Sequence, residues 1–92
     1  MSAKAEIGWR RLDADGERCQ VYAHHVGTEW RFFERRGRYE DWRPLPAPPL
    51  EDWLQLLDAI ERRLPRRRLP PAEAARVRKR IRELFPGVSL AG

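Results

Sequence analysis

The sequence predicts an α+β fold, in which an antiparallel meander of three to four strands precedes two amphipathic helices packed on one face of the sheet. Three observations support it: aromatic and polar residues alternate up to about residue 43, prolines cluster over 44–49, and apolar residues recur every three or four positions thereafter. A chain of 92 residues is long enough for one modest core. We therefore expect a single small domain, with the sheet over about 9–44.

The segment 30–42 holds five of the nine aromatic residues and is predicted to form a hairpin. A three-residue loop, Arg35-Arg36-Gly37, would put Gly37 in the left-handed region, where a residue without Cβ avoids a steric penalty. This register gives two opposite-charge pairs and two aromatic pairs, each contributing about 0.2–1 kcal/mol. The pairs are Glu34 with Arg38, Phe33 with Tyr39, Arg31 with Asp41, and Trp30 with Trp42.

The preceding hairpin is predicted to turn at Gly27-Thr28, where glycine suits the first central position of a type II′ turn. Because side chains alternate along strands, the two registers together define two faces. The tryptophan face, expected to be the core, carries Cys19, Val21, Ala23, His25, Trp30, Phe32 and Trp42. The outer face, free to meet a partner, carries Tyr22, His24, Arg31, Phe33 and Tyr39.

A further turn pattern, Asp13-Ala14-Asp15-Gly16, precedes these strands, so residues 9–12 are expected to add a first strand. The register of this strand stays open, and one choice places Trp9 on the tryptophan face. The same four residues resemble the start of a calcium loop but lack its later ligands. We interpret them as a turn.

Residues 44–49 are expected to form an extended connector, since proline restricts both itself and its predecessor. Residues 43–49 also match an arginine-led polyproline ligand, but a segment tied at both ends is better explained as a connector. Helices are predicted over about 50–64 and 71–85. Their apolar stripes are Leu50, Trp53, Leu54, Leu57, Ile60 and Leu64 in the first, and Ala74, Val77, Ile81, Leu84 and Phe85 in the second.

Charge is distributed unevenly along the chain. The net charge is +1 over residues 1–44, −4 over 45–61 and +8 over 62–92, so the C-terminal third carries the whole excess. Such a cluster would attract nucleic-acid phosphates or an acidic protein. Because seventeen of the nineteen basic residues are arginine, however, a compositional origin with a merely solvated helix face is the alternative. The candidate binding residues are Arg62, Arg63, Arg66, Arg67, Arg68, Arg76, Lys79 and Arg82.

Catalytic and metal sites are not expected. Cys19 and His25 share a face but lie about 20 Å apart along an extended strand, far beyond the reach of proton transfer. Cys19, His24 and His25 on one strand cannot close a tetrahedral zinc site alone. The acidic residues of the first helix are expected on its exposed face and ends, and no glycine-rich phosphate loop or nucleophile elbow occurs. We expect no cofactor and no enzymatic activity.

The sequence therefore favours a small binding module over an enzyme. The first hypothesis is nucleic-acid binding through the arginines of 62–82, and the alternative is a protein interaction or a homodimer that uses the outer face. Aromatics and arginine on an open sheet also suit stacking of unpaired bases, although ordinary cross-strand pairing explains them too. No apolar run is long enough to cross a bilayer, and the single cysteine suits a reducing compartment. We expect a cytoplasmic protein with no membrane partner.

Overall fold

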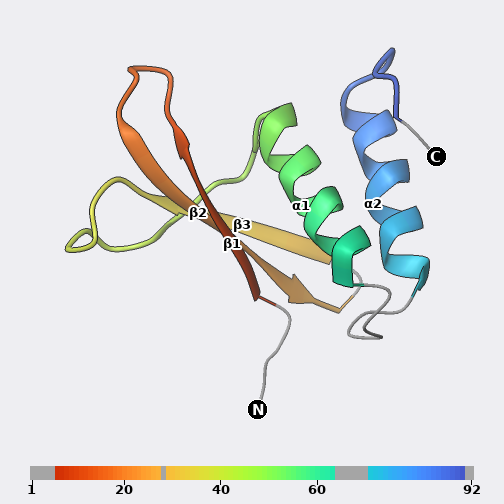
Figure 1. Ribbon diagram of the computed structural model, residues 1–92, viewed down its shortest axis with the longest axis horizontal. Coiled ribbons are helices and arrows are strands. Elements are labelled where there is room, and N and C mark those ends of the chain that lie inside the picture. The colour runs from red at the N-terminus through yellow and green to blue at the C-terminus, as the bar shows by residue number, and fades with distance from the viewer. Residues whose placement is uncertain (1–5, 28, 64–70, 91–92) are drawn as a thin grey trace. The chain divides into compact units, whose positions relative to one another are not determined.

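The computed structural model describes residues 6–27, 29–63 and 71–90. The chain divides into two compact units, Met1–Pro48 and Pro49–Gly92. The first unit holds the strands and the second holds the helices (Figure 1). The α+β class and the order of elements are confirmed. The packing of the helices on the tryptophan face stays a prediction.

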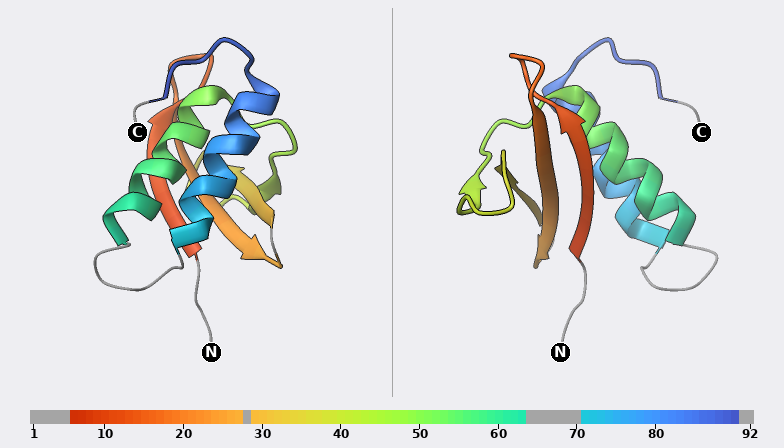
Figure 2. Two further views of the ribbon diagram at one scale, coloured as in Figure 1. Left: turned by 90° about the vertical axis from the view of Figure 1, so that its right-hand side faces the viewer. Right: turned by 60° about the vertical axis from the view of Figure 1, so that its left-hand side comes forward.

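The sheet unit is a four-stranded antiparallel meander of β1 (Glu6–Leu12), β2 (Arg18–Val26), β3 (Glu29–Arg35) and β4 (Arg43–Pro44). The strands lie in the order of the sequence, and β4 is only two residues long (Figure 2). The predicted first strand is present and begins three residues earlier than expected. In its register Trp9 lies opposite Val21, which places it on the tryptophan face.

The β1–β2 turn is built around Asp13, as its sequence predicts. Asp13 Oδ1 accepts hydrogen bonds from the backbone N–H groups of Asp15 at 2.9 Å and Glu17 at 3.0 Å. Gly16 donates its N–H to the Asp13 carbonyl and adopts φ +81°, a conformation that favours glycine. These hydrogen bonds hold the segment in the conformation of a turn.

The β2–β3 hairpin has the predicted register. Val26 lies opposite Glu29, His25 opposite Trp30 and Tyr22 opposite Phe33. Gly27 adopts φ +63°, as its place in a two-residue loop requires, while Thr28 lies outside the described residues. Because side chains alternate along the strands, the buried residues of the sheet share one face. These residues are Ile7, Cys19, Val21, Ala23, Trp30 and Phe32.

The predicted hairpin over 30–42 is wrong in register. Phe33 lies opposite Pro44 and Glu34 opposite Arg43, so the loop between β3 and β4 runs from 36 to 42. The expected pairs of Glu34 with Arg38, Phe33 with Tyr39, Arg31 with Asp41 and Trp30 with Trp42 do not form. Gly37 is not among the glycines with positive φ.

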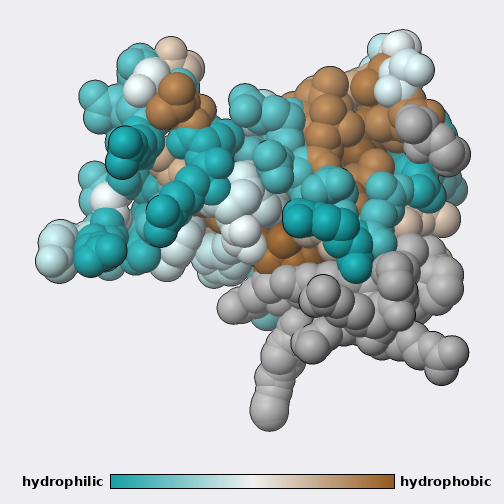
Figure 3. Space-filling view, viewed as in Figure 1, coloured by the Kyte–Doolittle hydropathy of each residue, from teal (hydrophilic) through white to brown (hydrophobic). Residues whose placement is uncertain are grey.

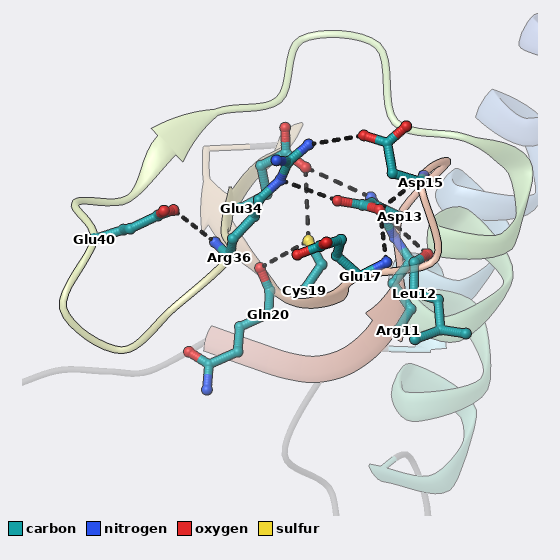
Figure 4. A network of polar contacts seen from close by, with 10 residues as sticks. All are labelled: Arg11, Leu12, Asp13, Asp15, Glu17, Cys19, Gln20, Glu34, Arg36 and Glu40. Atoms are coloured by element: carbon teal, nitrogen blue, oxygen red, sulfur yellow. Dashed lines mark hydrogen bonds and ion pairs between the residues drawn. The ribbon is translucent and has the colours of Figure 1, made fainter.

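The 36–42 loop is held by contacts of Arg36, including contacts with a distant turn, that the cross-strand pairs expected from the sequence did not include. The Arg36 side chain forms ion pairs with Asp13 at 3.0 Å and Asp15 at 3.3 Å, which ties the loop to the β1–β2 turn. The Arg36 backbone N–H also donates to Glu40 Oε1 at 3.0 Å (Figure 4). Lengthening a loop costs little, about 0.6 kcal/mol for each doubling. Contacts of this kind therefore offset the cost of the longer loop.

In the helix unit, α1 (Leu50–Arg63) and α2 (Pro71–Leu84) run antiparallel, side by side (Figures 1 and 2). Both lie within about one residue of their predicted bounds. The α1 N-terminus begins after Pro49, whose carbonyl accepts the N–H of Asp52 at 3.0 Å. The hydrophobic surface visible in Figure 3 gathers over these helices.

The buried side of α1 differs from the predicted stripe. Leu56 is fully buried whereas Leu54 is 39% exposed, and Asp52, expected among the residues of the exposed face and ends, lies in the first turn but is fully buried. At 100° per residue the buried side is rotated by roughly 60° from the predicted one. In α2 the predicted Ala74, Val77 and Ile81 are buried, but Leu84 in the last turn is 41% exposed. Leu64 lies outside the described residues.

Among the described residues, no helix has the length and apolar character needed to span a membrane.

Candidate functional site

The basic helical region, residues 62–82, is the first predicted binding surface, and the structure describes part of it. Arg66, Arg67 and Arg68 lie outside the described residues, and Arg63 is described only as part of α1. The remaining predicted cations, Arg62, Arg76, Lys79 and Arg82, are all exposed. The surface is thus partly placed, on the end of α1 and along α2.

Several arginines of this region engage carboxylates. Arg62 pairs with Asp58 at 3.1 Å and Arg80 with Glu83 at 3.3 Å, both between exposed side chains. Arg76 pairs with the buried Glu73 at 2.5 Å. The two exposed pairs contribute only about 0–1 kcal/mol each, so a phosphate can compete for the guanidinium groups of Arg62 and Arg80.

Arg78 is set apart from the other basic residues of α2. It pairs with Glu61 of α1, and its side chain is only 22% exposed. This ion pair joins the two helices and gives Arg78 a structural role. By contrast, Lys79 and Arg82 lie one turn apart and make no ion pair with any described residue.

The outer face of the sheet is the second predicted surface, and it differs in membership from the prediction. Tyr22 and Phe33 form a cross-strand pair whose ring centroids lie 5.0 Å apart at an interplanar angle of 17°. His24 and Arg31 lie opposite each other on the same face, His24 half-buried and Arg31 exposed. The alternation prediction is therefore confirmed for these four residues.

Tyr39 and Trp42 were assigned to the wrong places because the hairpin register was wrong. Tyr39 does not lie on the outer face; it sits in the 36–42 loop and is 95% exposed. Trp42 does not join the buried layer beside Trp30. It lies at the outer face, edge-on to Tyr22 with a centroid distance of 4.7 Å and an angle of 90°.

Arg35 holds Trp42 in this position. Its guanidinium carbon lies 4.4 Å from the Trp42 ring centroid, and its Nε donates to Gln20 Oε1 at 2.7 Å. A second guanidinium nitrogen donates to the Arg38 carbonyl at 3.2 Å. One arginine of β3 thus fixes a side chain of β2 and an aromatic ring of the loop.

An open depression of about 620 Å³ lies on the outer face, lined by Gly8, Trp9, Arg10, Gln20, Val21, Tyr22 and Trp42. Gly8 lies directly opposite Tyr22, so the floor has no side chain at this position. Five residues around the depression were not among the site residues predicted from the sequence: Gly8, Arg10, Gln20, Arg35 and Trp42. A glycine inside a strand is a recognised sign of space beside the backbone, but it was informative only once the β1 register was known.

The chemistry of Cys19 agrees with a structural role for this residue. Burial raises the pKa of its thiol, and the nearby Glu34 acts in the same direction against the opposing effect of Arg11. A thiol with a raised pKa is a poor nucleophile at neutral pH. Among the described residues, no group of three or more His, Cys, Asp or Glu side chains could hold a metal ion.

Comparison with known proteins gives no match to a protein-family model, a curated protein or a solved structure.

Proposed function

We propose that the protein is a non-catalytic module that binds nucleic acid through phosphate contacts from the basic helical region. The observation that supports this proposal most directly is the charge distribution on α2. This helix has five basic residues and two acidic ones, but the Glu73 side chain is only 2% exposed and Glu83 is paired with Arg80. The solvent-facing side of α2 is consequently strongly cationic.

Within this surface, Lys79 and Arg82 are the strongest candidates for phosphate contacts. Both are exposed, and neither must break an ion pair with a described residue before it meets a phosphate. The logarithm of the affinity falls linearly with the logarithm of the salt concentration. Each cation that neutralises a duplex phosphate makes this slope steeper by about 0.9. The binding that we propose is therefore weakened by salt.

The test compares two double variants with the same loss of charge. Fluorescence anisotropy with a labelled duplex, measured across a salt series, is expected to show a slope reduced by about 1.8 for Lys79→Ser with Arg82→Ser. The control is Arg38→Ser with Arg43→Ser, which removes two exposed cations from the sheet unit. No binding by the wild-type protein at low salt, or equal losses in both variants, would contradict the proposal.

A protein partner is the second candidate function, either a further copy of this chain or an acidic protein. It is favoured by two exposed apolar side chains at opposite ends of the outer face, Leu12, which is 60% exposed, and Val26, which is 40% exposed. Native mass spectrometry tests it, since Leu12→Ser with Val26→Ser should abolish a dimer. A protein that stays monomeric at high concentration and captures no acidic partner would rule this function out. We further propose a cytoplasmic location, which the single buried cysteine supports.

A further inference from the structure

The depression over Gly8 is an open hollow bordered by the rings of Tyr22 and Trp42. Tyr22 has a cross-strand neighbour on each side, Phe33 on β3 and Gly8 on β1. The Phe33 ring stacks with Tyr22, whereas Gly8 contributes no side chain. Space is therefore left beside one aromatic ring, and Trp42 lines the same space from the loop. Its volume falls in the range of about 300–1,000 Å³ that is typical of small-molecule sites.

The polar groups around this space are oriented before any ligand arrives. Because Gln20 Oε1 accepts the Arg35 Nε–H, the amide nitrogen of Gln20 is the end left to donate, and it makes no hydrogen bond to a described residue. The same Arg35 lies over the Trp42 ring. Gln20 and Trp42 are thus positioned by one guanidinium, which lowers the entropy that a ligand would otherwise lose in ordering them.

The charge around the depression selects for an anionic ligand. Arg10 lines it, and Arg18 and Arg31 lie on the same face of the sheet. All three are exposed and form no ion pair with the described residues, and the register also places two acidic residues, Glu6 and Glu29, on this face. A cationic rim around aromatic rings is complementary to a base attached to a phosphate backbone.

We propose that the depression over Gly8 binds an unpaired nucleobase of single-stranded nucleic acid. The base stacks on one ring of the perpendicular Tyr22–Trp42 pair and contacts the other ring edge-on, and the Gln20 amide donates to a carbonyl oxygen on the base edge. Arg10 contacts the adjoining phosphate. The ligand class is that of the proposed function, but the residues are different. The charged rim favours this ligand over an apolar peptide.

The first experiment fills the depression. A Cβ built at Gly8 would lie 3.5 Å from the Val21 carbonyl oxygen and 3.8 Å from Tyr22 Cβ, both ordinary contacts, and Gly8 is not a positive-φ glycine. Gly8→Leu therefore places its longer side chain in the site, and Gly8→Ala, which adds the Cβ alone, is the matched control. Circular dichroism checks that both variants fold.

The probe is an oligothymidylate of about ten nucleotides, a length within single-strand site sizes, compared with an abasic phosphodiester of equal length. Gly8→Leu and Trp42→Ala are each expected to weaken oligothymidylate binding by about 5- to 160-fold, as loss of one stacked base predicts, and to leave abasic binding unchanged. Gly8→Ala is expected to have a smaller effect. Equal affinity of the wild-type protein for the two oligomers would overturn the inference, although nucleic-acid binding by α2 would still stand.

A second measurement needs no variant and so does not depend on folding of the mutants. Uridine monophosphate is titrated into the full-length protein while backbone amide and indole N–H shifts are recorded. The expected changes are centred on Gly8, Gln20 and Trp42, and ribose phosphate should not reproduce them. Shifts confined to α2, or concentration-dependent shifts on the outer face without ligand, would overturn the inference in favour of phosphate-only binding or self-association. Base-dependent shifts at Gly8 without salt-dependent binding to α2 would contradict the proposed function alone.

Discussion

Replacing Trp42 by alanine tests the arrangement of the outer face, because the two hairpin registers predict different costs. In the structure Trp42 is 36% exposed and contacts Tyr22 edge-on and the Arg35 guanidinium. The aromatic pair contributes about 0.5–1.5 kcal/mol and a largely exposed cation–π contact about 0.5–1 kcal/mol. Trp42→Ala should therefore lower the free energy of unfolding by about 1–2.5 kcal/mol through the loss of these two contacts, in addition to its lost apolar burial, which is smaller than that of Trp30.

Trp30 provides the matched comparison. It is 9% exposed and stacks on His25 at a centroid distance of 4.6 Å, so Trp30→Ala should cost about 3–5 kcal/mol as a core truncation. The register predicted from the sequence placed both tryptophans in the core and would give the two variants similar costs.

Urea unfolding followed by far-UV circular dichroism is the suitable assay, because each variant removes a fluorophore. The slope of the free energy against urea should stay constant, so that the shift in midpoint reports stability alone. A double-mutant cycle of Trp42→Ala with Arg35→Met should give a coupling of about 0.5–1 kcal/mol. If Trp42→Ala costs as much as Trp30→Ala, or if the coupling is absent, the contacts described for Trp42 are incorrect.

Three further predictions concern glycine conformation, helix orientation and acid stability. Gly27→Ala should lower the free energy of unfolding by about 1–2 kcal/mol, because Gly27 has a φ of +63°. Gly37 has no positive φ and no atom within 4 Å of an added Cβ, so Gly37→Ala should change the free energy of unfolding by less than about 0.5 kcal/mol. Thermal unfolding of the two variants distinguishes these outcomes. Leu56→Ala should lower the free energy of unfolding by about 2–5 kcal/mol, whereas Leu54→Ala should lower it by less than about 1 kcal/mol because Leu54 is half-exposed. The reverse order in urea unfolding would show that α1 buries the side predicted from the sequence. The pKa of Asp13 is lowered mainly by the backbone N–H of Glu17, with smaller contributions from the Asp15 N–H and Arg36. The stabilising effect of the Asp13 carboxylate is therefore fully present above the usual aspartate pKa of about 3.9 and is lost as pH falls toward the lower folded pKa. Asp13→Asn should reduce the loss of stability in acid when urea midpoints are measured from about pH 6 to pH 3, and an unchanged pH dependence would assign that loss to other carboxylates.

The parts of the fold that local physics controls could be predicted from the sequence. A glycine that must adopt positive φ specified the two-residue turn after Val26, and the register of β2 against β3 followed from it. Prolines and apolar spacing located both helices to within about one residue, since these signals act within a single turn of the chain. Tyr22 and Phe33 were therefore assigned correctly to the outer face.

The candidate site on the outer face could not be predicted, because it depends on residues that are distant in the sequence. The cross-strand pairs expected for 30–42 contribute about 0.2–1 kcal/mol each, and alternatives of similar strength exist elsewhere. Arg36 forms ion pairs with Asp13 and Asp15 of another turn. Trp42 contacts the Tyr22 ring and the Arg35 guanidinium. Similarly, the periodicity of α1 allows either Leu54 or Leu56 to be buried, and only tertiary neighbours distinguish them.

By itself, the sequence determined the α+β class, the strand order, the β2–β3 register and the helix bounds, because each depends on backbone preferences and short-range periodicity. It also determined the concentration of positive charge after residue 61. The tertiary structure decided which ring lies beside Tyr22, that Gly8 leaves space opposite it, and which cations of α2 have no carboxylate partner among the described residues. The reason is energetic: single long-range contacts of about 1 kcal/mol choose between local arrangements that differ by no more than that.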